Sequence, residues 1–241
     1  IYVMNIDGSG QARLTNDPAD DNSPAWSPDG TRIAFTSGRD GNSEIYVMNA
    51  DGTGQTHLTD NAASDFYPTW SPDGTRIAFA SDRDGNNEIY VMNADGSGLI
   101  RLTESLGPDQ TPAWSPDGGR IAFVTDRFAP DSAGRPRDRF GLALVDPETG
   151  AIEPVETFAT GKSINPQWAP DGGSLYFIAD PEGIPDLHRV ELAGGRVEPL
   201  TRLGTGISGI THLSPALTVA RRTGEVVFSA YDRGSFELFR Y

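Results

Sequence analysis

The chain has 241 residues, a formal net charge of −15 at pH 7, 37% hydrophobic residues, 28 Gly, 18 Pro and no Cys. This acidity disfavours nucleic acid and anionic lipid surfaces as partners, and the absence of cysteine excludes disulfides and thiolate metal sites. No apolar run reaches the roughly 18 residues that a membrane-spanning helix needs. We therefore expect no nucleic-acid partner and no direct membrane insertion.

The first segment, residues 1–15, opens inside the motif "IYVMNIDGSG", which recurs later as a strand and a turn. Two strands are predicted here. Because the chain starts at Ile1 within this motif, we interpret it as a fragment, or as a chain whose leader and first elements are missing.

The repeated unit is clearest in residues 67–103, "YPTWSPDGTRIAFASDRDGNNEIYVMNADGSGLIRLT". The first predicted strand, "PTWS", ends in the four-residue turn "SPDG", which has Pro and Gly where such turns favour them. "RIAFAS" follows, with bulky side chains on one face and small ones on the other. "EIYVMN" is apolar on both faces, and an Asp-Gly turn leads from it to a short outer strand, "LIRLT". The pattern predicts a four-stranded antiparallel sheet.

Tandem copies of this unit decide the fold class. Trp26, Trp70, Trp114 and Trp168 are spaced by 44, 44 and 54 residues, and a degenerate copy follows with Leu213 in the Trp position. A four-stranded unit of this length, repeated in tandem, predicts an all-β fold, a β-propeller in which each sheet is one blade. We expect a single domain over residues 1–241, with a half blade at 1–15, full blades at 16–59, 60–103, 104–156 and 157–202, and a degenerate blade at 203–241. The predicted total is 21 strands, and six blades are preferred over five.

The pattern "WSPDGTRIAF…S.RDGN.EIYVMNADG.G...LT" resembles the WD40-like (PD40) repeat of TolB-type propellers. Three copies match closely, the fourth ("WAPDGGSLYFIAD") is looser, and the fifth keeps only "LSP" and "GEVVFSA". The resemblance implies a six-bladed bacterial propeller in the periplasm, or a secreted one, that docks a lipoprotein at the mouth of its channel. Similar repeats occur in propellers of the prolyl oligopeptidase family, so the fold alone does not assign the function.

A search for catalytic and nucleotide-binding motifs gives little support for an enzymatic site. His57, His188 and His212 do not occupy matching positions in the blades, and no H-E-x-x-H spacing is present, so we expect no zinc site. Gly204 to Gly209, "GTGISG", matches G-x-G-x-x-G in letters, but no helix pattern follows it. G-x-S-x-G is absent. We therefore expect no catalytic residue and no cofactor.

A weak calcium pattern lies in the loops between the second and third strands. "SDRDGNNE" places Asp82, Asp84 and Asn86 at alternate positions, as in calcium loops. The Gly that follows comes earlier than in those loops, so a hairpin turn in which Asp caps the backbone is the alternative. Calcium stays a weak prediction.

The connections between blades are acidic, and the matching loop of the third blade is basic. We predict a docking face for a protein or peptide there, since loops on a rigid scaffold commonly serve recognition; solvated loop charge is the alternative. The candidate contact residues are Asp20, Asp21, Asp65, Asp109, Arg127, Arg135, Arg137 and Arg139.

Two functional hypotheses follow. The first is a non-catalytic, TolB-like propeller that binds a partner through these loops. The second is the accessory propeller of a prolyl-oligopeptidase-like hydrolase whose catalytic domain lies outside this chain. A weaker third possibility, an enzyme that uses the channel, is disfavoured because the inner strands "NSPAW", "FYPTW", "QTPAW" and "INPQW" supply no His or acidic ring.

Overall fold

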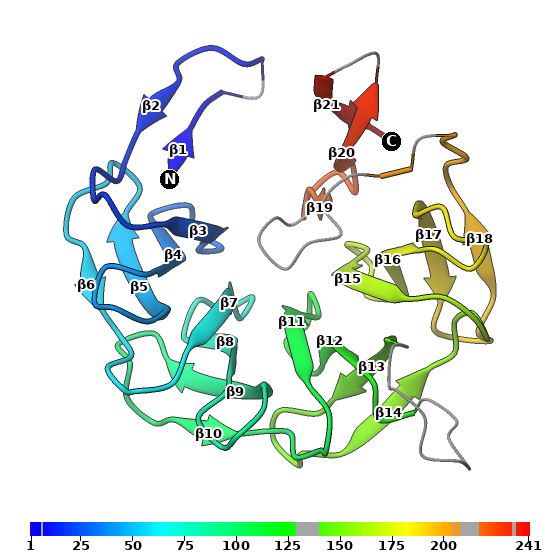
Figure 1. Ribbon diagram of the computed structural model, residues 1–241, viewed down its shortest axis with the longest axis horizontal. Helices are drawn as coiled ribbons and strands as arrows, with labels where there is room; N and C mark the ends of the chain where they lie inside the picture. Colours follow the sequence, from blue (N-terminus) through cyan, green and yellow to red (C-terminus); the bar gives the residue numbers. More distant parts are fainter. Residues whose placement is uncertain (6, 129–139, 205, 208–216, 233–234) are drawn as a thin grey trace.

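The computed structural model describes residues 1–5, 7–128, 140–204, 206–207, 217–232 and 235–241, and all regular structure in them is β (Figure 1). His212, Arg135, Arg137 and Arg139 lie outside the described residues. The described strands form six antiparallel sheets. The chain begins with a two-stranded sheet of β1 (Tyr2–Val3) and β2 (Ala12–Arg13), and ends with a three-stranded sheet of β19 (Leu217–Val219), β20 (Val226–Asp232) and β21 (Ser235–Arg240).

Four sheets of four strands lie between them in the sequence. The first two are β3 (Asp21–Trp26), β4 (Arg32–Ser37), β5 (Glu44–Asn49) and β6 (Thr56–His57), followed by β7 (Asp65–Trp70), β8 (Arg76–Ser81), β9 (Glu88–Asn93) and β10 (Ile100–Arg101). The next two are β11 (Asp109–Trp114), β12 (Ile121–Thr125), β13 (Gly141–Val145) and β14 (Ile152–Val155), followed by β15 (Ser163–Trp168), β16 (Ser174–Ala179), β17 (Asp186–Glu191) and β18 (Val197–Pro199).

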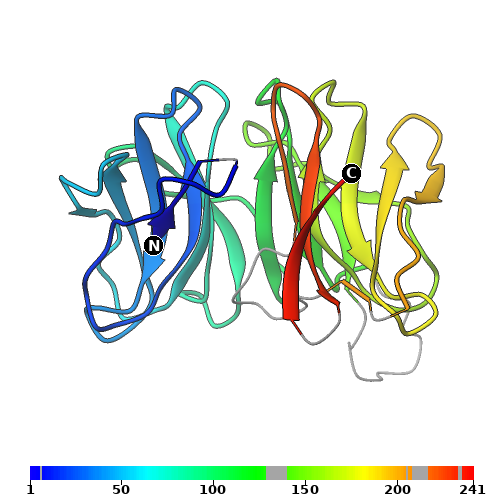
Figure 2. The same ribbon diagram turned by 90° about the horizontal axis from the view of Figure 1, so that it is seen from above.

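The sheets stand side by side around a ring, as the repeat predicts (Figures 1 and 2). The first strand of each repeat lies nearest the centre of the ring, and the fourth lies at its rim. Five blades are found, four of them with four strands and one with three, which is the smaller of the two predicted numbers. The two-stranded sheet β1–β2 lies beside the first blade.

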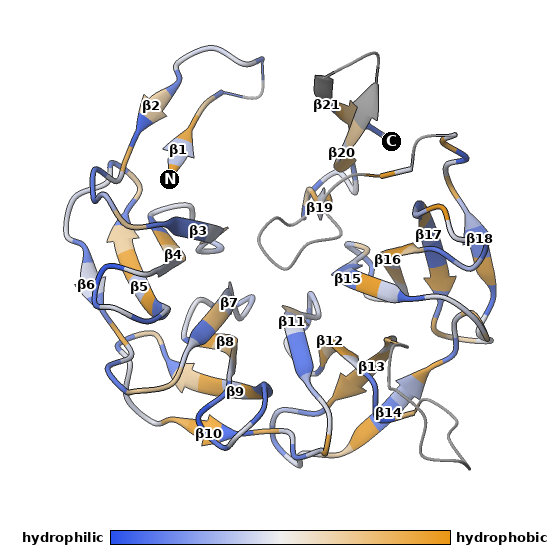
Figure 3. Cartoon of the chain, viewed as in Figure 1, coloured by the Kyte–Doolittle hydropathy of each residue, from blue (hydrophilic) through white to orange (hydrophobic). Residues whose placement is uncertain are grey.

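The middle strands form the core because both of their faces are covered. In β8, Ile77 and Phe79 point to one side and Ala78 and Ala80 to the other, and all four are fully buried. The small face of one blade receives the bulky face of the next: one cluster joins Ala34, Ile45 and Val47 of the first blade to residues of the second, namely Trp70, Ile77, Phe79, Tyr90 and Met92. Figure 3 shows this apolar character in β4, β5, β8 and β9.

The inner strands of the four complete blades share a β-bulge. Their register shifts by one residue at the same place in each, between Asn22 and Ala25 in β3, for example. The residue before the strand's proline there has a positive φ, although it is not Gly: 51° at Ser23, 56° at Tyr67, 49° at Thr111 and 53° at Asn165. Such a conformation costs on the order of 1–3 kcal/mol and persists only where the surroundings impose it. Since four different residue types adopt it, the bend belongs to the blade and not to a particular side chain.

The residues of the repeated "WSPDGTR" motif make contacts within a blade and between blades. Within the second blade, the Ser71 hydroxyl donates to Asp73 Oδ1 at 2.6 Å and accepts from the Arg76 amide at 2.9 Å, which closes the turn. Between blades, Trp70 Nε1 donates to the Ala25 carbonyl at 3.1 Å, and the Arg32 guanidinium lies 4.5 Å from the centroid of the Trp70 ring. The motif is therefore scaffolding, repeated because each blade has the same neighbour to pack against.

Candidate functional site: the connection face

One end of the ring gathers the first four connections between sheets, all of which are described. We define the connection face as the connections 14–20, 58–64, 102–108 and 156–162 together with the loops between second and third strands, 38–43, 82–87, 126–128 and 180–185. Loop and connection meet at each blade boundary: the amide of Asp65 donates to the Ser43 carbonyl at 2.7 Å, that of Asp109 to the Asn87 carbonyl at 2.7 Å, and that of Ser163 to the Phe140 carbonyl at 2.8 Å. The sequence prediction that these segments share one face is confirmed by these bonds.

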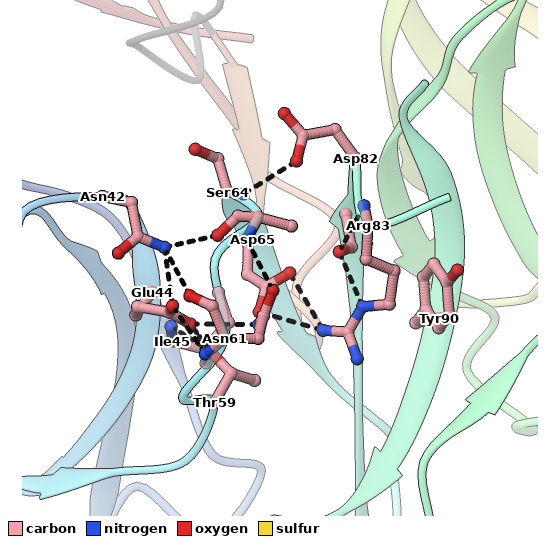
Figure 4. Close-up of polar contacts among 12 residues, drawn as sticks. Asn42, Glu44, Ile45, Thr59, Asn61, Ser64, Asp65, Asp82, Arg83 and Tyr90 are labelled. Atoms are coloured by element: carbon pink, nitrogen blue, oxygen red, sulfur yellow. Dashed lines mark hydrogen bonds and ion pairs between the residues drawn. The ribbon is translucent and has the colours of Figure 1, made fainter. Parts of the chain in front are cut away.

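Beneath this face, the first and second blades are joined by a buried polar cluster (Figure 4). Glu44 is almost fully buried; its carboxylate accepts from the Thr59 hydroxyl at 2.5 Å and from the Asn61 amide at 3.1 Å. The Asn61 side chain also donates to Asp65 Oδ2 at 2.8 Å, so it links the two acids. Burial raises the pKa of Glu44, and the charge of Asp65 adds to that effect. The cluster fixes the connection against the loop of the preceding blade.

Each of the three inner-strand aspartates is paired with an arginine from the same blade. Arg83 bonds both carboxylate oxygens of Asp65, at 3.1 and 3.0 Å, and its guanidinium lies 4.7 Å from the centroid of the Tyr90 ring. The pair Arg39–Asp21 repeats this arrangement, with Tyr46 in place of Tyr90. Arg127 bonds only Oδ2 of Asp109. In the Arg83–Asp65 pair, both bonds come from one guanidinium nitrogen, Nη2. Removing one partner of such a largely buried pair would leave an uncompensated charge.

The cluster between the second and third blades differs at one position. Ser105 replaces the linking asparagine, and its hydroxyl donates to the Gly107 carbonyl instead of to the acid. Among the described residues, no donor reaches Oδ1 of Asp109, which is fully buried. Burial raises the pKa of Asp109 to about 6 and the charge of Glu88 adds to this, while Arg127 offsets only part of it. This boundary contains the least satisfied carboxylate of the three.

The burial of four side chains corrects part of the predicted set of docking residues. Asp65 and Asp109 are fully buried because each is the first residue of an inner strand and not the last of a loop. Asp21 and Arg127 have side chains only 4% and 16% exposed and are held in the same kind of pair. Asp20 is exposed on the connection face, as predicted.

The predicted calcium residues are directed to different partners. Asp82 Oδ1 accepts from the Ser64 amide at 2.8 Å, whereas Asp84 accepts from the Tyr90 hydroxyl and lies 3.3 Å from Arg101. Asn86 turns its amide nitrogen inward, toward the Gly107 carbonyl at 2.7 Å. In the described part of the chain, these three side chains thus have separate partners, and no group of three or more His, Cys, Asp or Glu side chains is placed to hold a metal ion.

The two described histidines pack against aromatic rings. His57 lies on β6 and stacks on Tyr46, with ring centroids 4.6 Å apart. His188 is buried beside Phe158, and burial lowers its pKa. Of the G-x-G-x-x-G match, Gly204 and residues 206–207 are described, and the Ile207 amide donates to the Pro185 carbonyl at 2.7 Å. That bond ties the segment into the connection face.

The surface of the connection face combines apolar and acidic side chains. Leu106, Phe128 and Ile184 are 88%, 47% and 45% exposed. The segments of Leu106 and Phe128 meet where Gly107 lies against the side chain of Asp126. The approach is so close that a Cβ on Gly107 would lie 1.9 Å from Asp126 Oδ1. The exposed acids on this face include Asp20, Asp60, Asp82 and Glu104. Sequence reasoning identified the charge of this face and missed its exposed apolar residues.

Comparison with known families decides the class of the propeller. A model of the TolB β-propeller domain (PD40) matches residues 1–66 and 53–136, more than half of the chain. The chain belongs to the TolB β-propeller family. The described residues contain no helix that is long and apolar enough to cross a membrane.

Solved structures of this family share its architecture. TolB from Acinetobacter baumannii is similar over 99% of this chain and 56% of that one, with a TM-score of 0.81 and 22% identity. A putative TolB from Agrobacterium tumefaciens is similar over 99% of this chain and 87% of that one, with a TM-score of 0.75 and 24% identity. At these identities the likeness shows the fold alone.

Two peptidases are also similar to the TolB propeller described here. A puromycin-hydrolyzing peptidase from Mycobacterium tuberculosis is similar over 97% of this chain and 39% of that one, with a TM-score of 0.69 and 18% identity. Dipeptidyl-peptidase 5 of Porphyromonas gingivalis is 38% identical over 45 residues, which are 19% of this chain and 7% of that protein. The chain thus spans only a fraction of the length of these relatives.

Proposed function

We propose that this TolB-family propeller is a non-catalytic scaffold that binds a protein or peptide through its connection face. The observation that supports this most is the pair of exposed large apolar side chains Leu106 and Phe128, whose segments meet where Gly107 lies against Asp126; Ile184 is exposed on the same face. Large apolar residues exposed together and rimmed by polar ones mark interaction sites on soluble proteins. The elements that hold them are fixed from below by the buried polar clusters, so the face is presented as a rigid surface.

The charge of the face indicates the chemistry of the partner. Exposed acids share this face with the apolar residues, and the whole chain has a net charge of −15. Opposite charge on the partner would speed association and suppress wrong partners. We therefore propose a segment that combines basic residues with leucine-like or aromatic ones. Arg135, Arg137 and Arg139, which lie outside the described residues, remain proposed contact residues.

Selection from a random peptide library tests the proposal and leaves the choice of partner to the protein. A phage-displayed library is panned on the wild-type chain, and the enriched peptides are synthesised and titrated by calorimetry. We expect enriched sequences that contain both basic and apolar residues. The double variant Leu106→Ser, Phe128→Ser should lower their affinity by about 100-fold, because anchors at the centre of an interface are worth about 2 kcal/mol or more.

A matched control uses exposed apolar residues at the rim of the ring. Leu99 and Ile100 are both exposed, at the outer strand of the second blade, and the double variant Leu99→Ser, Ile100→Ser should leave the affinity unchanged. The proposal is wrong if the enriched peptides bind both double variants equally well, or if only the rim variant loses binding.

The similarity to two peptidases supports a second candidate, an accessory propeller that orients substrate for a hydrolase domain encoded elsewhere. The coding sequence that flanks residues 1–241 distinguishes the two: a hydrolase domain in the same reading frame favours the second candidate. A signal peptide in that sequence favours the periplasmic or secreted location that the resemblance to TolB implies.

A further inference from the structure

The turn between the first two strands of the last sheet, β19–β21, departs from the repeat. In the four complete blades this turn holds Pro followed by Asp, and the four aspartates are Asp29, Asp73, Asp117 and Asp171. The last sheet has "ARRTGE" there, so Arg221 and Arg222 take the places of Pro and Asp. The turn still closes as the others do, because the Ala220 amide donates to the Glu225 carbonyl at 2.9 Å. Two cations therefore replace the acid that the other turns carry.

Arg221 extends across the ring instead of packing on the next turn. Its Nη2 donates to the Trp70 carbonyl at 3.3 Å. Trp70 is the last residue of β7 in the second blade, and the third and fourth blades stand between that blade and the last sheet (Figure 1). A proline at the corresponding place behaves differently, since a Cβ added at Gly224 would lie 3.5 Å from Pro170 of the neighbouring turn. The Arg221 guanidinium thus lies toward the middle of the ring.

The Arg221 guanidinium has no carboxylate partner within the described residues, where the Trp70 carbonyl is its hydrogen-bond acceptor. Other enclosed arginines are paired with an acid, as Arg39 is at 3.1 Å and Arg83 at 3.0 Å. The Arg221 side chain remains accessible to solvent, yet burial of part of it lowers its pKa, and no carboxylate offsets this effect. Removing a cation from water is costly unless a counter-charge compensates for it. Arg221 is therefore an accessible, partly desolvated cation whose counter-charge is missing from the described structure.

The acids at the same end of the ring are engaged within their own turns. Asp73 Oδ1 accepts from the Ser71 hydroxyl at 2.6 Å and from the backbone amide two residues further on at 3.0 Å. Asp29 and Asp117 accept the same two kinds of bond, and these bonds lower the pKa of all three carboxyls. Residues 208–216, which precede β19, contain no Asp or Glu. The counter-charge of Arg221 is therefore expected from a ligand.

We propose that Arg221 is an anion-binding residue at the turn end of the ring, and that its ligand is a carboxylate. A guanidinium presents parallel N–H donors that match the two oxygens of a carboxylate or a phosphate. The turn aspartates and the net charge of −15 favour a singly charged ligand, because a more highly charged anion such as phosphate is repelled more strongly. Small organic acids and the C-termini of peptides both present this group, and the experiment below separates them.

This site is independent of the partner proposed above. The turns between first and second strands lie at one end of the ring and the connection face lies at the other (Figure 2). A ligand bound by Arg221 and a peptide bound on the connection face would therefore not share residues. The failure of one proposal leaves the other standing.

An NMR titration of the arginine side chains of the 241-residue chain provides the test. The chain is labelled with ¹⁵N-arginine, and the Nε resonance that Arg221→Gln removes is assigned to Arg221. Sodium acetate is then titrated against sodium chloride at constant ionic strength. We expect this resonance to shift with acetate and to saturate, with a Kd on the order of 1–10 mM, because two charge-assisted hydrogen bonds form at a partly exposed site. Inorganic phosphate should bind several-fold more weakly.

Tri-alanine with a free C-terminus, and the same peptide with an amidated one, separate the two sources of the carboxylate. The free peptide should shift the Arg221 resonance and the amidated peptide should not. A free peptide that binds at least tenfold more tightly than acetate assigns the site to chain ends, and equal affinities assign it to small organic acids.

The neighbouring cation supplies the matched control. Arg221→Gln retains a donor for the Trp70 carbonyl and removes the charge, so the variant should keep the Tm of the wild type. Saturation transfer from the protein to the acetate methyl group measures binding in the variants. Arg221→Gln should lower the affinity for acetate about tenfold or more, whereas Arg222→Gln, in the same turn, should change it less than twofold.

Three results would overturn the proposal. The first is an Arg221 resonance that acetate shifts no more than chloride does. The second is an equal loss of acetate binding in Arg221→Gln and Arg222→Gln, which would show only the general charge of the turn. The third is equal binding of the free and the amidated peptide, which would show that the carboxylate is not what the site recognises.

Discussion

Ser105→Asn tests the polar clusters that hold the connection face in place. At the first boundary, Asn61 Nδ2 donates to Asp65 at 2.8 Å and its Oδ1 accepts from the Ala63 amide at 2.8 Å. The substitution places the same amide beside Asp109, whose Oδ1 has no donor within the described structure. A hydrogen bond to a charged group contributes about 1.5–3 kcal/mol, and the lost bond from Ser105 to Gly107 costs about 1 kcal/mol. We expect the free energy of unfolding to increase by about 1–2 kcal/mol at pH 7.

The pH dependence gives this prediction a second readout. Because the pKa of Asp109 is raised to about 6 in the folded chain, its contribution to stability is full below pH 4 and is lost as the pH rises through 6. A shift of about two units corresponds to about 3 kcal/mol. Ser105→Asn stabilises the carboxylate and lowers this pKa, so the loss between pH 4 and 6 should become smaller.

Urea unfolding followed by tryptophan fluorescence at pH 4, 5, 6 and 7 measures both effects. The converse substitution, Asn61→Ser, is the matched control and should destabilise the chain by about 1–2 kcal/mol at pH 7. The reasoning is refuted if Ser105→Asn lowers stability at pH 7, or if it leaves the fall in stability between pH 4 and 6 as large as in the wild type.

Three further substitutions, each with a control at a matched site, test the packing of the ring by urea unfolding. Trp70→Phe should lower the free energy of unfolding by about 2–4 kcal/mol, because it removes a buried indole hydrogen bond and the contact with Arg32. Its control, Trp26→Phe, should lower it by less than about 0.5 kcal/mol. Equal losses for the two variants would contradict the account. Gly52→Ala places a Cβ 2.8 Å from the Leu14 carbonyl oxygen, whereas Gly8→Ala, at the same repeat position with a similar φ, places its Cβ where nothing lies within 4 Å. Gly52→Ala should therefore lower the free energy of unfolding by about 1–3 kcal/mol more than Gly8→Ala does. Arg83→Leu leaves Asp65 buried without its cation and should cost about 3–5 kcal/mol, while Arg196→Ala, from an exposed pair, should cost under about 1 kcal/mol.

The repeat made most of the fold predictable. Strand order, turn positions and the 21 strands of the described residues follow from one unit, because each blade packs on a neighbour of the same kind and thus needs the same residues. The positive φ before each inner-strand proline was not predictable, since the proline disfavours it locally and only the ring imposes it.

The candidate site was predicted less well, for a reason visible in Asp65. Its position directly before "FYPTW" suggested a loop, yet it begins the inner strand and is buried. A signal was present: each inner-strand aspartate is followed 18 residues later by an arginine, in the pairs Asp21–Arg39, Asp65–Arg83 and Asp109–Arg127. Recurrence at a fixed spacing indicates a structural pair, and the residues that vary between repeats, such as Leu106 and Phe128, are the ones we propose for recognition.

The most direct test of the central claim is the hydrogen-exchange footprint of a peptide selected on the wild-type chain. The account predicts that the bound peptide slows exchange in residues 82–87, 102–108 and 126–128, which belong to the connection face. It predicts no change in the turns 71–75 and 115–119, at the opposite end of the strands. Protection confined to those turns would show that the partner binds the other end of the ring, and would contradict the assignment of function to the connection face.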